Sequence, residues 1–127
     1  MLATKTSELL GNLNTLIGDL ENQLKSYQKL EESLSNKYYL FSEEKYNLIS
    51  SKVSAIIRDI KIILYASQSL LNKSFRQRLS DDSRKLSDDY LTITSDYFGR
   101  KNKWAEEINA IRNILESLCS APRSIKI

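Results

Sequence analysis

Acidic residues occur as adjacent pairs along the chain, and carboxylates are side chains that bind hard cations and transfer protons. The five pairs are Glu31-Glu32, Glu43-Glu44, Asp81-Asp82, Asp88-Asp89 and Glu106-Glu107. A calcium-binding loop arranges its oxygen ligands around a glycine, whereas the acidic stretch 81–89 has no glycine and is divided by Arg84 and Lys85. The sequence also gives no sign of the cleft that a pair of glycosidase carboxylates needs. We interpret the pairs as solvated helix ends and predict no metal ion.

Histidine is absent from the 127 residues. Haem ligation, di-iron binding through Glu-x-x-His and histidine phosphotransfer all need an imidazole, and so do Ser-His and Cys-His nucleophilic catalysis. Cys119 is the single cysteine, which excludes an intrachain disulfide. These absences predict a protein that is not an enzyme and has no cofactor.

Basic and aromatic side chains alternate in one short region: Tyr97, Phe98, Arg100, Lys101, Lys103 and Trp104. Residues 67–127 carry eleven Lys/Arg and eight Asp/Glu, which accounts for the whole net charge of +3. Such a mixture can stack on nucleobases and neutralise phosphates, but it is also the composition of hot spots in protein interfaces. Because interleaved acids would repel a polyanion, we expect a protein partner, with nucleic acid or a weak contact to an anionic surface as alternatives.

Further apolar residues lie outside the main helical stripes. Tyr38, Tyr39 and Phe41 follow the first predicted helix, while Leu91 and Ile114 join Phe98 off the main stripe of the third. Because proteins seldom leave large contiguous apolar patches in water, we expect self-association or an obligate partner. The predicted partner-binding residues are therefore Tyr38, Tyr39, Phe41, Leu91, Tyr97, Phe98, Arg100, Lys101, Lys103 and Ile114.

These candidates are carried by segments with helical periodicity. The clearest is an apolar ladder with alternating steps of three and four residues, Tyr46, Ile49, Val53, Ile56, Ile60 and Ile63. The chain has few of the usual helix breakers, with three glycines and one proline. The spacing predicts helices over 7–35, 43–79 and 83–120 and no β-strand. Short connections between them favour an all-α, antiparallel three-helix bundle in a single domain, 1–127.

The ends of these helices can also be predicted. We expect the first helix to begin near Thr6 or Ser7 and to turn at 35–37, although it could continue into the second because no glycine or proline separates them. Ser42, followed by two glutamates, predicts an N-cap with acids in the first turn of the second helix. Pro122 ends the third helix, and 122–127 is expected to be a short mobile tail.

The third ladder has an interruption. Between Tyr97 and Trp104 the expected apolar residue is replaced by Lys101, next to Gly99. The steps therefore contain a stutter of four residues, which predicts local unwinding, a kink or a break near Gly99.

The composition is that of a globular chain, and the sequence also bears on where the protein is found. Hydrophobic residues make up 41% and charged residues 28%, which is typical of a packed domain. No stretch approaches the ~18 apolar residues of a membrane span, and residues 1–5 lack the layout of a secretory signal, so we expect a cytoplasmic protein. The expected core residues are Leu13, Leu20, Leu24, Val53, Ile56, Ile60, Ile63, Ile108, Ile111 and Leu115.

Residues 86–108 resemble the third helix of syntaxin-type regulatory three-helix domains, through Tyr97-Phe98, Arg100, Lys103 and Ile108 in a polar amphipathic setting. This resemblance covers about a fifth of the chain. It implies a regulatory or tethering module of membrane traffic whose basic and aromatic region touches lipid or a SNARE helix. In size and helix content the chain is also similar to small coiled-coil chaperones of bacterial secretion systems.

Our main prediction is a non-enzymatic protein–protein interaction module, such as an assembly subunit, adaptor or export chaperone, that docks helix to helix. The membrane-traffic module and a small nucleic-acid-binding helical protein are the alternatives.

Overall fold

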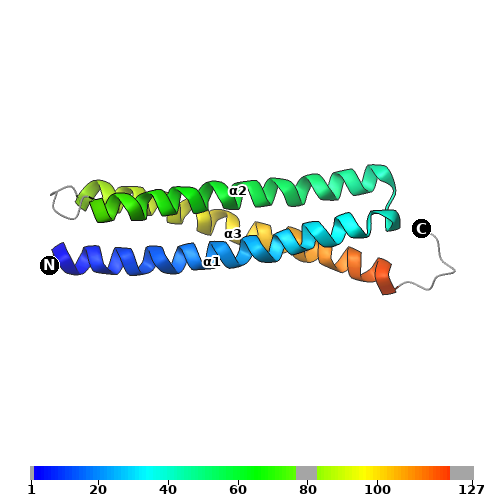
Figure 1. Ribbon diagram of the computed structural model, residues 1–127, viewed down its shortest axis with the longest axis horizontal. Coiled ribbons are helices and arrows are strands. Elements are labelled where there is room, and N and C mark those ends of the chain that lie inside the picture. Colours follow the sequence, from blue (N-terminus) through cyan, green and yellow to red (C-terminus); the bar gives the residue numbers. More distant parts are fainter. Residues whose placement is uncertain (1, 77–82, 121–127) are drawn as a thin grey trace.

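The computed structural model describes residues 2–76 and 83–120. Its elements are α1 (Leu2–Asn36), the 3-10 helix η1 (Tyr38–Leu40), α2 (Glu43–Arg76) and α3 (Ser83–Ser120). Figure 1 shows α1 and α2 lying antiparallel, with α3 running in the direction of α1. Each helix packs against the other two, and the described residues contain no strand. The predicted all-α, antiparallel three-helix bundle is therefore confirmed.

Most helix ends agree with the sequence pattern. α2 begins at Glu43, and α3 begins at Ser83 and ends at Ser120, as predicted. The expected start of α1 was wrong, because the helix already begins at Leu2. Residues 2–6 contain no glycine or proline, so nothing in their backbone stops the helix before Ser7. The predicted residues 77–79 of the second helix and the tail 122–127 lie outside the described residues.

A tight turn separates α1 from α2, which settles whether the two helices are continuous. In η1 the Leu40 amide donates to the Lys37 carbonyl at 3.0 Å, and Phe41 then adopts an extended conformation. The Lys45 amide donates to the Ser42 hydroxyl oxygen at 3.2 Å. Ser42 therefore caps α2, as predicted, and this side chain satisfies one of the free amides at the helix start.

The core consists of the inward stripes of all three helices. Of the ten expected core residues, nine are buried and Leu24 is half-buried against them. Ile60 and Ile108 are almost fully enclosed, at 0% and 1% exposure. The buried Ser67 fits this apolar setting because its hydroxyl donates to the Ile63 carbonyl one turn earlier, at 2.8 Å.

α3 is one continuous helix through Gly99, so the alternative of a break is excluded. Gly99 is exposed and has no positive φ, and Lys101 is half-buried where the ladder lacks an apolar residue. The helix changes neighbours along its length (Figure 1). Near its start it borders α2 through residues 89–93, and near its end the Arg112 guanidinium donates to Ser26 of α1 at 2.7 Å.

Candidate partner-binding surface

The structure divides the predicted basic and aromatic region of α3 between core and surface. Tyr97 and Trp104 are buried, with ring centroids 6.2 Å apart. Phe98 follows Tyr97 directly but is 62% exposed. Because successive residues on an α-helix are rotated by about 100°, neighbours in sequence cannot share one face. Tyr97 is therefore withdrawn from any partner, and Phe98 is the aromatic side chain of this region that a partner can reach.

Tyr97 is fixed in the interface between α3 and α1. The Gln23 side-chain amide donates to the Tyr97 hydroxyl oxygen at 3.0 Å, whereas the Gln23 carbonyl oxygen is buried without a hydrogen-bond partner. Burial raises the pKa of Tyr97, since it disfavours the phenolate, and the hydrogen bond from Gln23 partly opposes this. The residue therefore acts as a structural contact between two helices.

Tyr27 of α1 makes a comparable contact further along α3. The Arg112 guanidinium lies 5.9 Å from the Tyr27 ring centroid while it donates to Ser26. Burial raises the pKa of Tyr27, and the positive charge of Arg112 partly lowers it. Both contacts hold α3 to α1.

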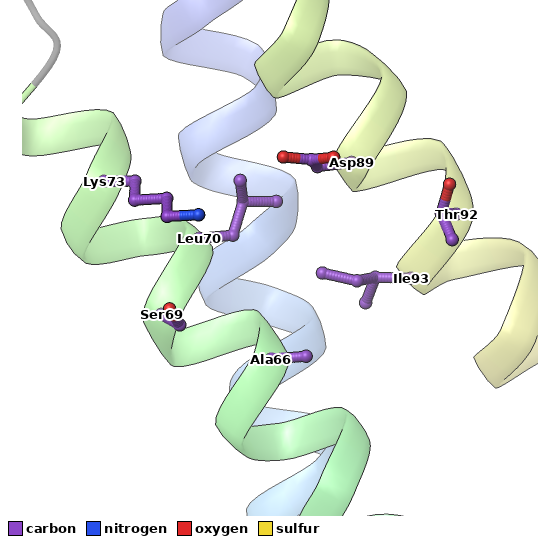
Figure 2. A pocket seen from close by; sticks show the side chains of 7 residues that line it. All are labelled: Ala66, Ser69, Leu70, Lys73, Asp89, Thr92 and Ile93. Carbon is purple, nitrogen blue, oxygen red and sulfur yellow. The ribbon is translucent and has the colours of Figure 1, made fainter.

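A hollow of about 270 Å³ lies between α2 and α3, with α1 passing behind it in Figure 2. Leu70 and Ile93 point into it, and Lys73 and Asp89 lie on its two sides. Its lining consists of Ala66, Ser69, Leu70, Lys73, Asp89, Thr92 and Ile93. This hollow was not predicted from the sequence. The available signal was the run of small residues on α2, which leaves space beside a neighbouring helix.

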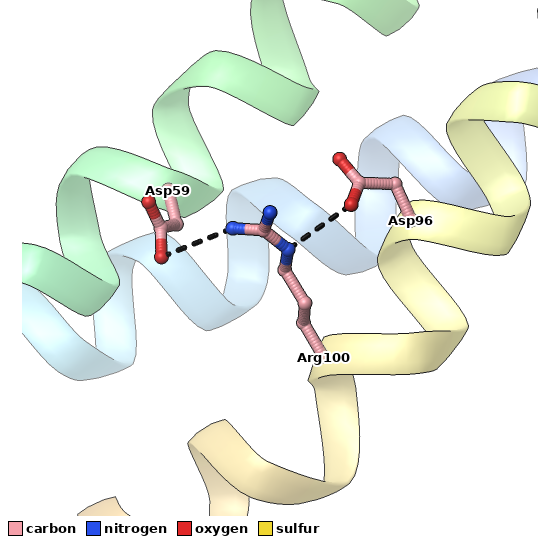
Figure 3. A network of polar contacts seen from close by, with 3 residues as sticks. All are labelled: Asp59, Asp96 and Arg100. Carbon is pink, nitrogen blue, oxygen red and sulfur yellow. Dashed lines mark ion pairs between the residues drawn. The ribbon is translucent and has the colours of Figure 1, made fainter.

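Arg100 is neutralised within the bundle. Its guanidinium pairs with Asp59 of α2 at 3.4 Å and with Asp96 on its own helix at 3.0 Å (Figure 3). The Arg100 side chain is about half exposed, so the two pairs contribute about 0–1 kcal/mol each. Their main effect is electrostatic, because two carboxylates cancel the charge that the sequence suggested for an anionic partner.

The remaining bases of this region differ in their surroundings. The Lys101 ammonium lies 5.6 Å from the Tyr97 ring centroid and 5.9 Å from that of Phe98. A cation over an exposed ring contributes about 0.5–1 kcal/mol. Lys103 is exposed to solvent. Leu91, two turns before Phe98, is 56% exposed. We call Leu91, Phe98 and Lys101 together the Phe98 surface.

Ile114 does not belong to the Phe98 surface. It was predicted, together with Leu91 and Phe98, to lie off the main stripe of the third helix and to contact a partner. The helix is continuous, so the sixteen residues from Phe98 to Ile114 turn the side chain by about 160°, to the opposite flank. Ile114 is instead half-buried and packs against the core.

The turn aromatics form a second exposed group at the end of the bundle. Tyr38 and Tyr39 are largely exposed, and their rings meet edge to face at 6.4 Å. Phe41 is half-buried, since its ring lies 6.4 Å from Tyr46 and packs on the core. Of the three predicted residues, the two tyrosines are thus the ones available to a partner.

The described part of the chain offers little for ligand chemistry. Within residues 2–76 and 83–120, no three His, Cys, Asp or Glu side chains lie close enough together to hold a metal ion. Cys119 is a free, exposed thiol. None of the described helices combines the length and the apolar character needed to cross a bilayer.

Comparison of the chain with models of known protein families, with curated proteins and with solved structures gives no match. No relative therefore supplies a function, and the exposed surfaces are the basis for one.

Proposed function

We propose that this protein is a non-enzymatic interaction module that binds a helical partner protein through the Phe98 surface. The observation that carries this proposal is the joint exposure of Phe98 and Leu91, at 62% and 56%, on one flank of α3. They are seven residues apart, which corresponds to two turns and about 10.5 Å along the helix. The same spacing separates equivalent positions in paired helices, so one helix of a partner can contact both side chains.

The energy available from this contact suits a reversible interaction. Complete burial of a leucine or phenylalanine side chain contributes about 1.5–3 kcal/mol. Since more than half of each side chain is exposed, covering both would contribute about 2–3 kcal/mol, a factor of about 30 to 150 in affinity. The neighbouring Arg100 is already paired with carboxylates. This favours an apolar protein contact over a polyanion such as nucleic acid.

Site-specific photo-crosslinking tests the proposal. A photoreactive phenylalanine analogue is placed at Phe98 in the full chain and, as a control, at the exposed Asn22 of α1. We expect a discrete protein adduct from position 98 in the cells that make the protein, with no such adduct from position 22. Tyr39 is a third position, which tests the exposed turn as an additional contact.

The variant Phe98→Glu separates binding from folding. For this variant the photoreactive analogue is placed at Leu91, because position 98 is then occupied by Glu. Since the Phe98 side chain is largely exposed, the substitution should abolish crosslinking from position 91 while leaving the helix content and melting temperature nearly unchanged. Equal adducts from positions 98 and 22, or unfolding by Phe98→Glu, would contradict the proposal. An adduct between two copies of the chain would instead identify self-association as the interaction.

A further inference from the structure

The outward side of α2 carries a second stripe with the spacing of a helix-packing face. Its members follow steps of three, four, three, four and three residues: Leu48, Ser51, Ala55, Arg58, Ile62 and Tyr65. Leu48, Ile62 and Tyr65 are among the largest exposed apolar side chains, and Ile62 is 59% exposed. The buried ladder of α2 occupies the other side of the same helix. α2 therefore has two packing faces, of which α1 and α3 cover one. We call the uncovered one the outer face of α2.

The residues between the large side chains are small. Between Leu48 and Ile62 the stripe contains Ser51 and Ala55, and Arg58 is its one large residue there. Two more small residues, Ala66 and Ser69, continue the face toward the end of α2. Small residues let the backbone of a second helix approach to the usual 8–10 Å, while the large ones fill its grooves. A helix that lies in a lipid interface buries a continuous apolar face, whereas Ser51, Ala55 and Arg58 interrupt this one. The pattern therefore favours a helix over a membrane.

The hollow between α2 and α3 adjoins this face. Ala66 and Ser69 line both the hollow and the continued outer face, and Leu70 and Ile93 form its apolar part (Figure 2). An apolar cavity of about 150 Å³ holds a benzene-sized group. The hollow, at about 270 Å³, therefore has room for one large apolar side chain of a helix that lies along α2.

The charge of α2 indicates the chemistry of that helix. Between residues 45 and 73 the sequence has five Lys/Arg and one acid, Asp59. Asp59 is held in an ion pair with Arg100 of α3, which also pairs with Asp96. Lys52 and Lys61 flank the outer face on its two sides and Arg58 lies within it, so bases outnumber the one acid of this segment. A partner with acidic residues beside its apolar stripe complements this arrangement.

Acids on the neighbouring helices do not reverse this charge. Glu31 of α1 accepts a hydrogen bond from Ser54 at 3.2 Å, and Asp89 of α3 faces Lys73 across the hollow. These two acids border the face and leave the excess of bases on it. A second copy of the chain placed face to face would bring the same bases together, so charge repulsion disfavours a symmetric dimer here.

We propose that the outer face of α2 binds one amphipathic helix of a partner protein whose apolar stripe is flanked by aspartate and glutamate. One apolar side chain of that helix enters the hollow between α2 and α3. This surface is on a different helix from the Phe98 surface, so either proposal can fail without the other.

Selection from a peptide library tests the proposal without knowledge of the natural partner. The full chain is immobilised and exposed to a displayed library of helices of about 21 residues, with apolar residues at the two seam positions of each heptad and random residues beside them. We expect the selected helices to be enriched in aspartate and glutamate at the flanking positions. Binding of one selected, fluorescently labelled peptide is then measured by anisotropy.

Three variants of the chain make the outcome specific to the outer face. Ile62→Glu should weaken peptide binding by about tenfold or more. Ala66→Trp, which fills the hollow, should also weaken it, and this variant provides the test if Ile62→Glu fails to fold. Asn22→Glu, which adds the same charge on exposed α1, should bind the peptide as the natural chain does. Selection of basic helices, selection of none, or equal binding by Ile62→Glu and the natural chain would overturn the proposal. So would binding to phosphatidylserine vesicles or duplex DNA through Ile62 in the absence of acidic helices.

Discussion

The buried pair Gln23 and Tyr97 allows a sharp test of how α3 is held to α1. Tyr97→Phe removes the hydroxyl that accepts the hydrogen bond from the Gln23 amide at 3.0 Å. The Gln23 carbonyl oxygen is already buried without a partner, so the variant leaves both ends of the amide unpaired. Leaving a buried polar group unpaired costs about 1–3 kcal/mol, and we expect Tyr97→Phe to lower the free energy of unfolding by that amount.

Gln23→Leu should behave differently, although it breaks the same hydrogen bond. It removes the unpaired carbonyl together with the amide, and it places an apolar side chain against the core. The Tyr97 hydroxyl then loses its partner, so we expect a cost of about 0–1 kcal/mol. The double variant Gln23→Leu with Tyr97→Phe leaves no polar group in this interface. Its cost should be smaller than the sum of the single costs by about 1 kcal/mol or more.

Urea unfolding followed by circular dichroism measures all four proteins of this cycle. The dependence of the unfolding free energy on urea should keep one slope, because each variant exposes nearly the same surface on unfolding. Strictly additive costs would show that the two side chains are not coupled. A cost below about 0.5 kcal/mol for Tyr97→Phe would show that water satisfies Gln23 equally well.

Three further predictions concern core packing, helix propensity and pH. Ile60→Ala should lower the free energy of unfolding by about 2–5 kcal/mol in urea titrations, because Ile60 is fully enclosed. Gly11→Ala and Gly18→Ala should each raise the melting temperature, with a gain of about 0.5–1 kcal/mol, since an added Cβ meets no atom within 4 Å; a loss would reveal a contact at that face. Burial raises the pKa of Tyr97 and Tyr27 in the folded state, so the unfolded chain releases these protons first. Stability should therefore hold below pH about 10 and fall as the pH rises further, and Tyr97→Phe should reduce that fall.

The bundle itself could be predicted because burial imposes a period on the sequence. The ladder through Val53 and Ile60 has the helical spacing that one buried face requires, and Ser42 is a residue type that caps helices. The start of α1 could not be predicted in the same way. Residues 2–6 are compatible with a helix but have no apolar period of their own, so local pattern gives no boundary there.

The exposure of the candidate site could be predicted in part. Tyr97 lies on the apolar ladder of the third helix and Phe98 lies off it, and in the structure Tyr97 is buried and Phe98 is exposed. Tyr97 was counted as partner-binding because of its basic and aromatic neighbours, and its burial removes it from that set. Ile114 lies off the main stripe, as Phe98 does, but on the opposite flank of α3, where it is half-buried against the core. The outer face of α2 was not predicted from the sequence, because serine, alanine and Arg58 interrupt its large apolar residues. It can be recognised once the buried face of α2 is known.

The number of helices also determines how this molecule would carry tension. With three helices, α1 begins and α3 ends at opposite ends of the bundle (Figure 1), separated by roughly the 50 Å that a helix of this length spans. A pull between these two points would draw α1 and α3 past each other along their length. The buried side chains of the two helices would then resist together, in shear. In a two-helix hairpin the same pull would break the contacts one after another, starting at the open end. The arrangement of the three helices therefore favours resistance to a pull applied along the bundle.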